Sequence, residues 1–490
     1  MKQQAMLLCD MYKLSHRKQY PEGTELVYST WTPRDSRNKN ITSVVSFGQQ
    51  KFIKEYLINF FNENFFHTSK RKVVEDYTRI VKNTLGDQNP DTSHIEALHD
   101  LQYLPLEIKS IPEGMSVPIR VPMCTIQNTD PRFFWLTNFV ETLFSCEMWQ
   151  ATTSATMARE YYTLLKGYAD ETSSTPDFVK FQGHDFSMRG MSSLNSAITS
   201  GMGHLLYFNG TDTIPAILGH EEFYNANVEK ELVGTSIPAS EHSVACANGM
   251  DEKATLIRFL DQVYPTGMVS FVSDTWDFWN LVGNILPSIK ETIMNRDGKL
   301  VIRPDSGDPV KIVIGDETAD NEWAKKGLVQ SLWEIFGGTT NQKGYKELDS
   351  HIGAIYGDSI TLELAKAISE GLKTKGFATT NVVYGIGSYT YQYNTRDTFG
   401  FALKSTLVKI NGDEQMIFKN PKTDNGIKKS QKGAVVVFED LNTGLLQFQD
   451  NLTLAQANDC QNNLLTTIFK NGRLVKETSL KEIREIANGN

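Results

Sequence analysis

Between residues 175 and 390, short apolar runs repeatedly end in a polar cluster, and helical segments separate the runs. The runs are "FVKFQ" before "GHDFSMRG", "LLYF" before "NGTDT", "MVSFV" before "SDTWD", "LVI" before "RPDSGD", "IGAIY" before "GDS" and "NVVY" before "GIGS". Helices are predicted between them, for example over 250–264 and 361–376. Repeated strand–loop–helix units predict a parallel sheet, and this many units favour an α/β barrel.

The two ends of the chain are predicted to be richer in β-structure. The segments there are 25–31 (strand), 49–65 (helix), 104–126 (strands) and 132–169 (helix). Asn411-Gly412 and Asn471-Gly472 each lie between strand-like segments, which is the strongest short-range signal for a hairpin. We therefore expect residues 1–150 and 395–490 to form one composite β-rich α+β domain beside a barrel domain of residues 151–394.

Composition and charge exclude several classes of protein. The 490 residues include 58 acidic and 49 basic side chains, a net charge of −9, which argues against a general surface for nucleic acid or anionic membrane. The five cysteines are scattered, and none forms a Cys-x-x-Cys pair, so neither a disulfide framework nor a structural zinc site is expected. No run approaches the ~18 apolar residues of a membrane helix. We predict a cytoplasmic protein with neither nucleic acid nor membrane as partner.

The polar clusters are expected to converge, because the carboxyl ends of parallel strands share one face. The residues placed there are His184, Asp185, Phe186, Arg189, Asp212, Glu241, His242, Asp274, Asp277, Arg303, Asp305 and Asp358, followed by Gly385-x-Gly387. Arginine suits bidentate contacts with phosphate, and Mg²⁺ prefers carboxylates together with phosphate oxygens. Backbone N–H groups at glycine-rich turns can hold a phosphate. The set predicts a site for a phosphorylated sugar with a divalent cation.

Each residue also has a structural interpretation that the sequence leaves open. Arg303 and Asp305 could form a salt bridge on a surface turn, Asp212 could be a helix N-cap, and His242 could be a structural histidine. Gly385-x-Gly387 is a weak dinucleotide fingerprint, because Thr390 stands where the third glycine belongs. The expected co-location of these residues is what favours a functional site.

Eight motifs then resemble the nicotinamide phosphoribosyltransferase family in order and spacing. They are "DMYKLSHRKQYP" (10–21), "GHDFSMRG" (183–190), "GTDT" (210–213), "PASEHS" (238–243), "SFVSD" (270–274), "IRPDSGDP" (302–309), "YGDS" (356–359) and "NTRD" (394–397). The resemblance implies a type II phosphoribosyltransferase fold, which is an irregular α/β barrel with a split β-rich α+β domain, and a homodimer with shared active sites. It implies that nicotinamide and 5-phosphoribosyl 1-pyrophosphate (PRPP) give nicotinamide mononucleotide and pyrophosphate, a step of NAD salvage.

The resemblance also assigns the binding of the base. Phe186 would stack on one face of the pyridine ring, and Tyr12 of the neighbouring subunit would stack on the other. Asp212 would accept a hydrogen bond from the carboxamide nitrogen, while Arg189 would contact the base or the phosphates. Ser270 is counted among the substrate-binding residues.

The same resemblance assigns the catalytic set His242, Asp305, Arg303 and Asp274. His242 and Arg303 would hold pyrophosphate, and Asp305 would contact the ribose or the metal-bound diphosphate. Mg²⁺ would be bound mainly through the diphosphate, near Asp305, without a dedicated protein site. ATP is an expected facultative activator that would phosphorylate His242.

The remaining implied residues surround the ribose phosphate. Those expected to cradle it are Gly357, Asp358, Gly387, Ser388 and Arg396, and those expected to reach in from the neighbouring subunit are Arg34 and Lys404. This chain departs from the animal enzymes of the family in having Ser388 and Tyr389 where glycines stand, and in having "SM" (187–188) where a glycine and a tyrosine are common.

Substrate choice is expected to depend on Asp212. A carboxylate accepts a hydrogen bond from the amide of nicotinamide but repels the carboxylate of nicotinate. A nicotinate phosphoribosyltransferase is therefore the alternative enzyme, and a catalytically silent binding or signalling relative is the alternative from another class. A metal hydrolase is a further rival, but its histidine-rich ligand set is missing from the strand ends.

Overall fold

The computed structural model describes residues 4–357, 359–420 and 429–489. The chain divides into two compact units. The first unit comprises residues 1–156, 219–226 and 394–490, and the second comprises residues 157–218 and 227–393. The barrel domain predicted for 151–394 therefore differs from the second unit, because residues 151–156, 219–226 and 394 belong to the first unit.

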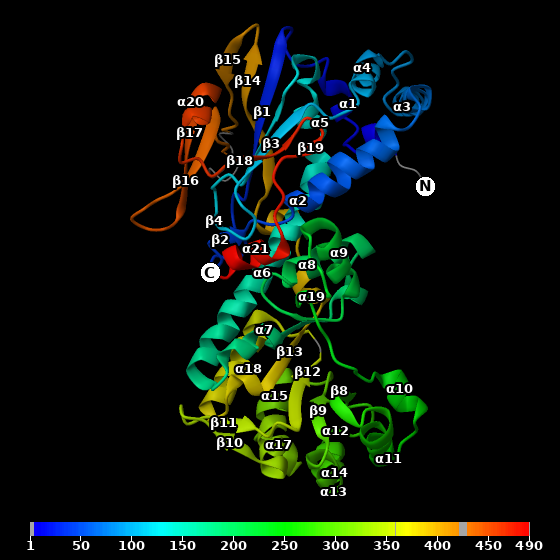
Figure 1. Cartoon of the computed structure of the whole chain (residues 1–490), viewed down its shortest axis with the longest axis vertical. Helices are drawn as coiled ribbons and strands as arrows, with labels where there is room; N and C mark the ends of the chain where they lie inside the picture. The colour runs from blue at the N-terminus through cyan, green and yellow to red at the C-terminus, as the bar shows by residue number, and fades with distance from the viewer. Residues whose placement is uncertain (1–3, 358, 421–428, 490) are drawn as a thin grey trace. The chain divides into compact units, whose positions relative to one another are not determined.

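The first unit is built on a seven-stranded antiparallel sheet with the order β15-β14-β1-β5-β3-β18-β19. Its strands are β1 (Thr24–Thr32), β3 (Leu106–Ser110), β5 (Cys124–Asn128), β14 (Ala402–Ile410), β15 (Asp413–Met416), β18 (Thr466–Lys470) and β19 (Arg473–Leu474). β1 pairs with β14 on one side and with β5 on the other, so the two ends of the chain share one sheet (Figure 1). This pairing is why a domain split in sequence is compact in space.

Both predicted Asn-Gly hairpins are confirmed. Asn411 and Gly412 connect β14 to β15 with φ values of 50° and 87°, and Asn471 and Gly472 connect β18 to β19 with φ values of 51° and 78°. Two consecutive positive φ angles define the tight turn that matches the twist of paired strands.

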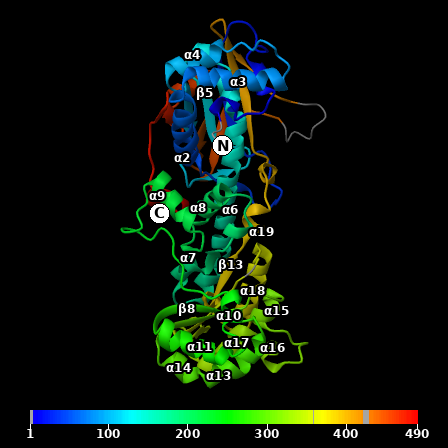
Figure 2. The same ribbon diagram turned by 90° about the vertical axis from the view of Figure 1, so that its right-hand side faces the viewer.

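Shorter elements surround this sheet. The strand pairs are β2 (Ser43–Val45) with β4 (Ser116–Pro118) and β16 (Ala434–Glu439) with β17 (Leu446–Leu452). The helices are α1 (Lys13–His16), α2 (Gln49–Phe52) with helical turns continuing to Phe66, α3 (Lys70–Thr84), α4 (Ser93–Leu101), α5 (Leu136–Phe139), α20 (Leu454–Asp459) and α21 (Leu480–Ala487). Helices α3 and α4 lie side by side in both views (Figures 1 and 2). Helix α6 (Glu141–Thr172) contains residues of both units.

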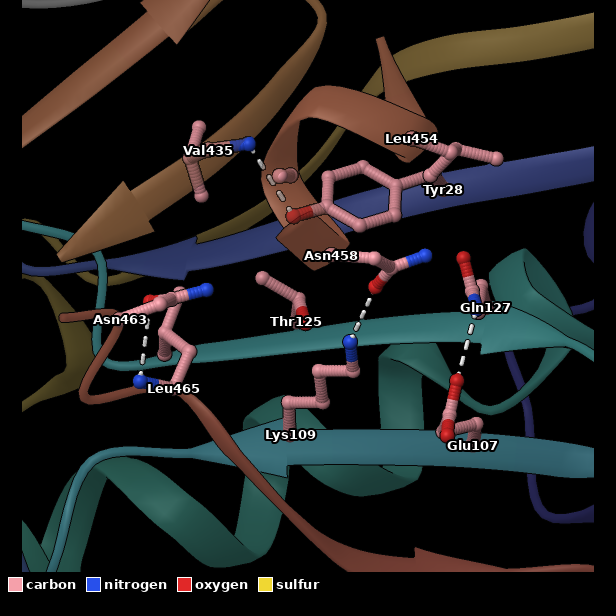
Figure 3. Close-up of a pocket in the computed structure, with 11 residues that line it drawn as sticks. Tyr28, Glu107, Lys109, Thr125, Gln127, Val435, Leu454, Asn458, Asn463 and Leu465 are labelled. Carbon is pink, nitrogen blue, oxygen red and sulfur yellow. Dashed lines mark hydrogen bonds between the residues drawn. The ribbon is translucent and has the colours of Figure 1, made fainter. Parts of the chain in front are cut away.

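Polar contacts join β16 and α20 to the sheet of the first unit (Figure 3). The Val435 backbone N–H donates to the Tyr28 hydroxyl (3.3 Å), and Lys109 Nζ donates to the side-chain oxygen of Asn458 (2.6 Å). The cavity between them measures about 10 Å³, which is at the lower limit for a single water molecule. It serves packing and offers no room for a substrate.

The second unit is built on a six-stranded parallel sheet with the order β7-β6-β13-β12-β9-β8. Its strands are β6 (Gly183–Asp185), β7 (Gly210–Thr211), β8 (Thr266–Val272), β9 (Asp297–Arg303), β12 (Ile352–Tyr356) and β13 (Val382–Ile386). The helices between or beside them are α7 (Val179–Gln182), α8 (Leu194–His204), α10 (His242–Ala247), α11 (Glu252–Arg258), α12 (Phe278–Asn280), α13 (Leu286–Ser288), α14 (Lys290–Met294), α15 (Pro309–Ile314), α16 (Glu322–Lys326), α17 (Leu328–Phe336), α18 (Leu362–Thr374) and α19 (Ser388–Gln392). Helix α9 (Ile214–Tyr224) contains residues of both units. A small hairpin, β10 (Gly338–Thr340) with β11 (Lys346–Leu348), completes the unit.

An extended segment, 235–240, joins the two edges of the parallel sheet. On the β7 side, Thr235 N–H donates to the Asn209 carbonyl (2.7 Å), and its own carbonyl accepts from Thr211 N–H (2.9 Å). On the β8 side, Ser270 N–H donates to the Pro238 carbonyl (2.8 Å), and Ser240 N–H donates to the Ser270 carbonyl (3.0 Å). The sheet is therefore closed by an irregular segment, which confirms the predicted irregular α/β barrel.

Two of the predicted strands were wrong in position. Residues 179–182, within "FVKFQ", form helix α7, and the strand β6 begins at Gly183; residues 205–208, "LLYF", precede the two-residue strand β7. Apolar runs this short fit a buried helix end as well as a buried strand, so periodicity could not distinguish the two.

Candidate active site

The carboxyl ends of the parallel strands gather most of the predicted residues of the second unit on one side of the barrel. β6 is followed by Phe186 and Arg189, β7 by Asp212, β8 by Asp274, and β9 ends at Arg303. Phe186, Arg189, Asp212 and Arg303 line two adjoining hollows, one inside the barrel and one at its mouth.

The inner cavity has a volume of about 410 Å³ and lies within the barrel. Its lining residues at the strand ends are His184, Phe186, Asp212, Ser236, Ser270 and Arg303. The outer cleft, of about 830 Å³, is lined by Arg189, His242, Arg303, Asp305 and Gly357 among others. Phe186, Asp212, Ala239 and Arg303 line both hollows, so they mark the boundary between the two.

Asp212 is held by two neighbouring side chains. His184 Nε2 lies 2.9 Å from Asp212 Oδ1, and the Ser236 hydroxyl donates to the same oxygen at 2.5 Å. Burial alone would raise the pKa of Asp212, but these hydrogen bonds and the charge of Arg303 more than offset it and lower the pKa below its ordinary value. The carboxylate is thus ionised, with Oδ1 engaged and Oδ2 left for a ligand. Neither bond caps helix α9, so the N-cap interpretation of Asp212 is wrong.

Arg303 lies largely buried between the two hollows. Its Nη2 donates to the Ser240 carbonyl (2.5 Å), while its Nε is buried with no hydrogen-bond partner in the described part of the chain. Burial lowers the pKa of Arg303, and the nearby charges of Asp305, Asp212 and Asp274 counteract that shift. Gly357 makes room for this side chain, since a Cβ there would lie 3.1 Å from Arg303 Cδ. Arg303 therefore forms no salt bridge with any carboxylate of the described residues, and it retains donors for an anion.

His242, Asp274 and Asp305 form a compact cluster at the cleft. His242 Nε2 lies 3.1 Å from Asp305 Oδ1 and 3.8 Å from Asp274 Oδ1, and its Nδ1 lies 3.0 Å from the Thr275 hydroxyl. Asp274 Oδ2 accepts from the Asp305 backbone N–H (3.1 Å) and from the Ser306 hydroxyl. Asp274 Oδ1 is buried without a hydrogen-bond partner among the residues described. The half-exposed His242 and the two carboxylates can thus contact a cation that is bound to a phosphate group.

The ligand types and spacing of this cluster fit a hard divalent cation. The potential ligand atoms of His242, Asp274 and Asp305 all lie within 4.8 Å of one another, and two of the three groups are carboxylates, the ligand type that Mg²⁺ prefers. Asp274 Oδ1 accepts no hydrogen bond from the described residues and lies 3.8 Å from His242 Nε2, so it can accept a bond from a metal or from a metal-bound water.

Three other predicted rim carboxylates have structural partners instead. Asp277 is the N-cap of α12 and accepts from the Asn280 N–H (2.9 Å). Asp185 is fully buried and accepts from the Ser187 N–H (2.9 Å). Glu241 is exposed and bonds to the neighbouring Ser243 hydroxyl.

The loop after β13 was the predicted phosphate cradle. Gly387 is the N-cap of α19, and Ser388 is the first residue of that helix. A Cβ at Gly190 would lie 2.1 Å from Ser388 Oγ, so Gly190 and Ser388 occupy adjoining space. Asp358 lies outside the described residues.

Four predicted site residues belong to the first unit. Tyr12 is exposed, with its ring centroid 5.1 Å from that of His16. Arg34 Nε donates to the Gly400 carbonyl (2.9 Å), Lys404 Nζ lies 3.4 Å from Glu141 Oε1, and Arg396 is paired with Asp397 at 3.7 Å. Their predicted role in a neighbouring subunit's site stays a prediction.

Sequence reasoning missed three contacts of the site. Ser236 precedes the "PASEHS" motif by only two residues, and Thr275 and Ser306 directly follow Asp274 and Asp305. Ser236 and Thr275 lie next to recognised motifs and Ser306 lies within the motif "IRPDSGDP", so position relative to the motifs was the available signal.

Comparison with known proteins places the chain in a family. Residues 181–473 match the model of the nicotinate phosphoribosyltransferase (NAPRTase) family, and residues 4–86 match that of the nicotinamide phosphoribosyltransferase N-terminal domain. A relative from Acinetobacter baylyi named nicotinamide phosphoribosyltransferase is 49% identical over 97% of this chain and 95% of its own. The chain belongs to the nicotinamide phosphoribosyltransferase family.

Further matches agree with this membership. A nicotinamide phosphoribosyltransferase of Mycoplasma pneumoniae is 37% identical over 86% of this chain and 92% of its own. The crystal structure of nicotinate-nucleotide pyrophosphorylase from Pyrococcus furiosus superposes with a TM-score of 0.59 at 16% identity, covering 99% of this chain and 94% of that one. The latter match supports the fold alone. Within the residues described, no helix is long and apolar enough to cross a membrane.

Proposed function

We propose that this member of the nicotinamide phosphoribosyltransferase family transfers the phosphoribosyl group of PRPP to the ring nitrogen of nicotinamide. The bond from the ribose anomeric carbon to the pyrophosphate oxygen breaks, pyrophosphate leaves with the electron pair, and the pyridine nitrogen forms the new bond. The products are nicotinamide mononucleotide and pyrophosphate, which makes the reaction a step of NAD biosynthesis. The observation that carries the proposal is the ionised Asp212 carboxylate at the boundary of the two hollows, beside Phe186.

The base is proposed to bind at this boundary. Phe186 offers an aromatic face, and Asp212 Oδ2 accepts from the amide NH₂. The Ser270 hydroxyl lines the same cavity and is buried without a hydrogen-bond partner in the described ranges, which leaves it free for the carboxamide. The pyridine nitrogen is already a nucleophile, so these residues act mainly by orienting it toward the sugar.

The leaving pyrophosphate is proposed to lie in the outer cleft. Negative charge accumulates on it as the bond breaks, so fixed cationic donors stabilise the transition state more than the ground state. Arg303 offers its unpaired Nε, and Arg189, which lines the same cleft, has no hydrogen-bond or ion-pair partner among the described residues. The carboxylates of Asp274 and Asp305 can also stabilise positive charge on the ribose, by analogy with glycoside cleavage.

Mg²⁺ is the proposed metal cofactor, brought by the diphosphate of PRPP. Asp305 and Asp274 would hold it, with His242 beside them. When bound, the cation neutralises diphosphate charge and so favours departure of pyrophosphate. The protein's own part is to fix both carboxylates through the hydrogen bonds that Asp274 accepts from the backbone of Asp305 and from Ser306.

The test is product formation from defined components. The purified chain is incubated with nicotinamide, PRPP and Mg²⁺, and nicotinamide mononucleotide and pyrophosphate are measured. Their formation in equal amounts supports the proposal. Binding of nicotinamide without any product would favour a catalytically silent binding protein, and product from nicotinate alone would favour a nicotinate enzyme.

A homodimer with shared sites is proposed from the four residues of the first unit, Tyr12, Arg34, Arg396 and Lys404. Tyr12 exposes more than half of its side chain, as expected of a ring that completes another subunit's site. Mixing inactive Tyr12→Ala with inactive Arg303→Ala protein tests this arrangement. Recovery of roughly a quarter of the activity is expected if each site takes residues from two chains, whereas no recovery contradicts sharing.

ATP is the proposed facultative activator, with His242 as the phosphorylated group. The imidazole nitrogen would attack the γ-phosphorus, and ADP would leave with the electrons of the broken bond. His242 suits this role because its side chain is 49% exposed at the cleft. Acid-labile label from γ-labelled ATP should appear on the wild type and be absent from His242→Ala; label on both proteins excludes this residue.

The cytoplasm is the proposed location. All five cysteines are free thiols, which fits a reducing compartment. Fractionation of the source cells tests this, and recovery in a secreted or membrane fraction contradicts it.

A further inference from the structure

His204, the last residue of helix α8, joins the strand before the base site to the helix after the predicted phosphate cradle. The side chains of His204 and Tyr391 are fully buried. His204 Nε2 lies 2.9 Å from the Gly210 carbonyl oxygen, and its Nδ1 lies 2.7 Å from the Tyr391 hydroxyl. Gly210 begins β7, two residues before Asp212, and Tyr391 belongs to α19, three residues after Ser388. One imidazole ring therefore contacts both segments.

The two partners of His204 determine which ring nitrogen carries the proton. Burial lowers the pKa of His204 and raises the pKa of Tyr391 well above its ordinary value, so both side chains are neutral. A carbonyl oxygen can only accept, so Nε2 carries the proton and donates to Gly210. Nδ1 is then an acceptor, and the Tyr391 hydroxyl donates to it. Loss of that hydroxyl would leave a buried nitrogen unsatisfied, which is costly.

Helix α19 is held by its neighbours through three consecutive side chains. Besides the bond of Tyr391, the Thr390 hydroxyl lies 2.9 Å from the Tyr161 hydroxyl. The side-chain oxygen of Gln392 accepts from the Ser192 backbone N–H at 2.8 Å. Of these three contacts, the one through Tyr391 leads to β7.

We propose that His204 is a positioning residue that aligns the phosphate loop, Gly387 and Ser388, with strand β7 through the hydroxyl of Tyr391. This inference rests on the proposed function, because the loop must hold the phosphate group of the ribose. Nicotinamide mononucleotide joins base and phosphate by covalent bonds, so the enzyme must hold the two binding segments at a matching separation. His204 and Tyr391 are both fully buried, and they act through Asp212 and Ser388 without touching the substrate.

The test measures binding of three probes to the full chain by calorimetry, so that the readout does not depend on turnover. PRPP, ribose 5-phosphate and inorganic pyrophosphate, each with Mg²⁺, are titrated into wild type and Tyr391→Phe. The Kd of PRPP and of ribose 5-phosphate should rise about tenfold in the variant, because a loop that is no longer preorganised must be ordered on binding. The Kd of pyrophosphate should change less than about twofold, since its proposed contacts are Arg303 and Arg189. An unchanged Kd for ribose 5-phosphate, or equal weakening of all three probes, overturns the proposal.

Tyr384→Phe is the matched control for loss of a buried hydroxyl. Tyr384 is fully buried in β13, and its hydroxyl lies 3.0 Å from the Ser369 hydroxyl of α18. This variant should lose thermal stability to a similar extent as Tyr391→Phe but should keep the wild-type Kd for ribose 5-phosphate. A tenfold weakening in the control as well overturns the proposal, because it would show a general effect of destabilisation.

His204→Gln tests the other side of the same hydrogen bond. Glutamine keeps an N–H for the Gly210 carbonyl and removes Nδ1, so the Kd of ribose 5-phosphate should again rise about tenfold. The double variant with Tyr391→Phe should bind no more weakly than either single variant, since both remove one interaction. A weakening of about a hundredfold in the double variant overturns the proposal. Should Tyr391→Phe not fold, the comparison of probes is made with His204→Gln.

These results separate this inference from the proposed function. A protein that makes nicotinamide mononucleotide, but whose Tyr391→Phe variant binds ribose 5-phosphate as the wild type does, refutes only the role of His204. A protein that shows the Tyr391-dependent Kd without turning over nicotinamide refutes only the transferase proposal.

Discussion

Replacing Asp212 by asparagine should change which base the enzyme prefers. The carboxylate lies 2.9 Å from His184 Nε2 and 2.5 Å from the Ser236 hydroxyl, and asparagine preserves the size of the side chain while removing its charge. A hydrogen bond to a charged acceptor contributes about 1.5–3 kcal/mol. Because 44% of the Asp212 side chain is exposed, the lower end applies, and kcat/KM for nicotinamide should fall about tenfold.

The same substitution should favour nicotinate. Two carboxylates about 4 Å apart repel by about 1 kcal/mol in water and about 4 kcal/mol near a protein surface. Because Asp212 is half-exposed, we expect an intermediate repulsion of about 2 kcal/mol. Removing its charge should therefore raise kcat/KM for nicotinate about 30-fold. The ratio of kcat/KM for nicotinamide to kcat/KM for nicotinate should therefore fall about 300-fold.

The assay is initial-rate measurement of both mononucleotides at saturating PRPP and Mg²⁺, with wild type, Asp212→Asn and the control Asp261→Asn. Asp261 is an exposed carboxylate of the same unit, and its substitution should leave the ratio unchanged. A ratio in Asp212→Asn that stays within about threefold of the wild type would refute the assignment of Asp212 to the amide.

Three other predictions concern separate parts of the chain. Arg303→Ala should lower kcat/KM by about 10²–10³, as loss of one preorganised donor does, while the melting temperature falls by only a few degrees; the reverse pattern would restore the surface-turn interpretation. Gly190→Ala should weaken PRPP binding, because the new Cβ meets Ser388, and Gly190→Ala with Ser388→Gly should recover it; no recovery would exclude that clash as the cause. Burial raises the pKa of Glu113 to about 7, above its unfolded value near 4.5, so the stabilisation present below pH 4.5 should be lost as pH rises through 7. The free energy of unfolding, measured with denaturant, should fall by about 3 kcal/mol over this pH range in the wild type and should not fall in Glu113→Gln. An equal pH dependence in both proteins contradicts the assignment of this effect to Glu113.

The barrel was predictable because its strands share a simple pattern. The runs "MVSFV", "LVI", "IGAIY" and "NVVY" lie mostly in buried strands that end at a polar cluster, and parallel pairing then brings the clusters together. The closing segment 235–240 was not predictable, since it pairs through only a few backbone bonds and carries no strand periodicity.

The sequence motifs predicted which residues gather at the site, but they did not predict which contact each side chain makes. Asp212 and Asp277 both looked like carboxylates at strand ends, yet one faces the cavity and the other caps a helix. Only the structure shows which partner each one has. The alternation of "KLVIR" places Lys299 and Arg303 on one face of β9, so the sequence also carried a signal that both side chains line the inner cavity.

The most direct test of the central claim is a competition between the two bases in a single reaction. Nicotinamide and nicotinate are supplied at equal concentration with PRPP, Mg²⁺ and wild-type protein, and the two mononucleotides are separated and counted. Preference for nicotinamide by about 10³-fold is the predicted result, since a mismatched polar contact at a half-exposed site discriminates somewhat less than a buried one. Equal product from both bases, or more from nicotinate, would contradict the account.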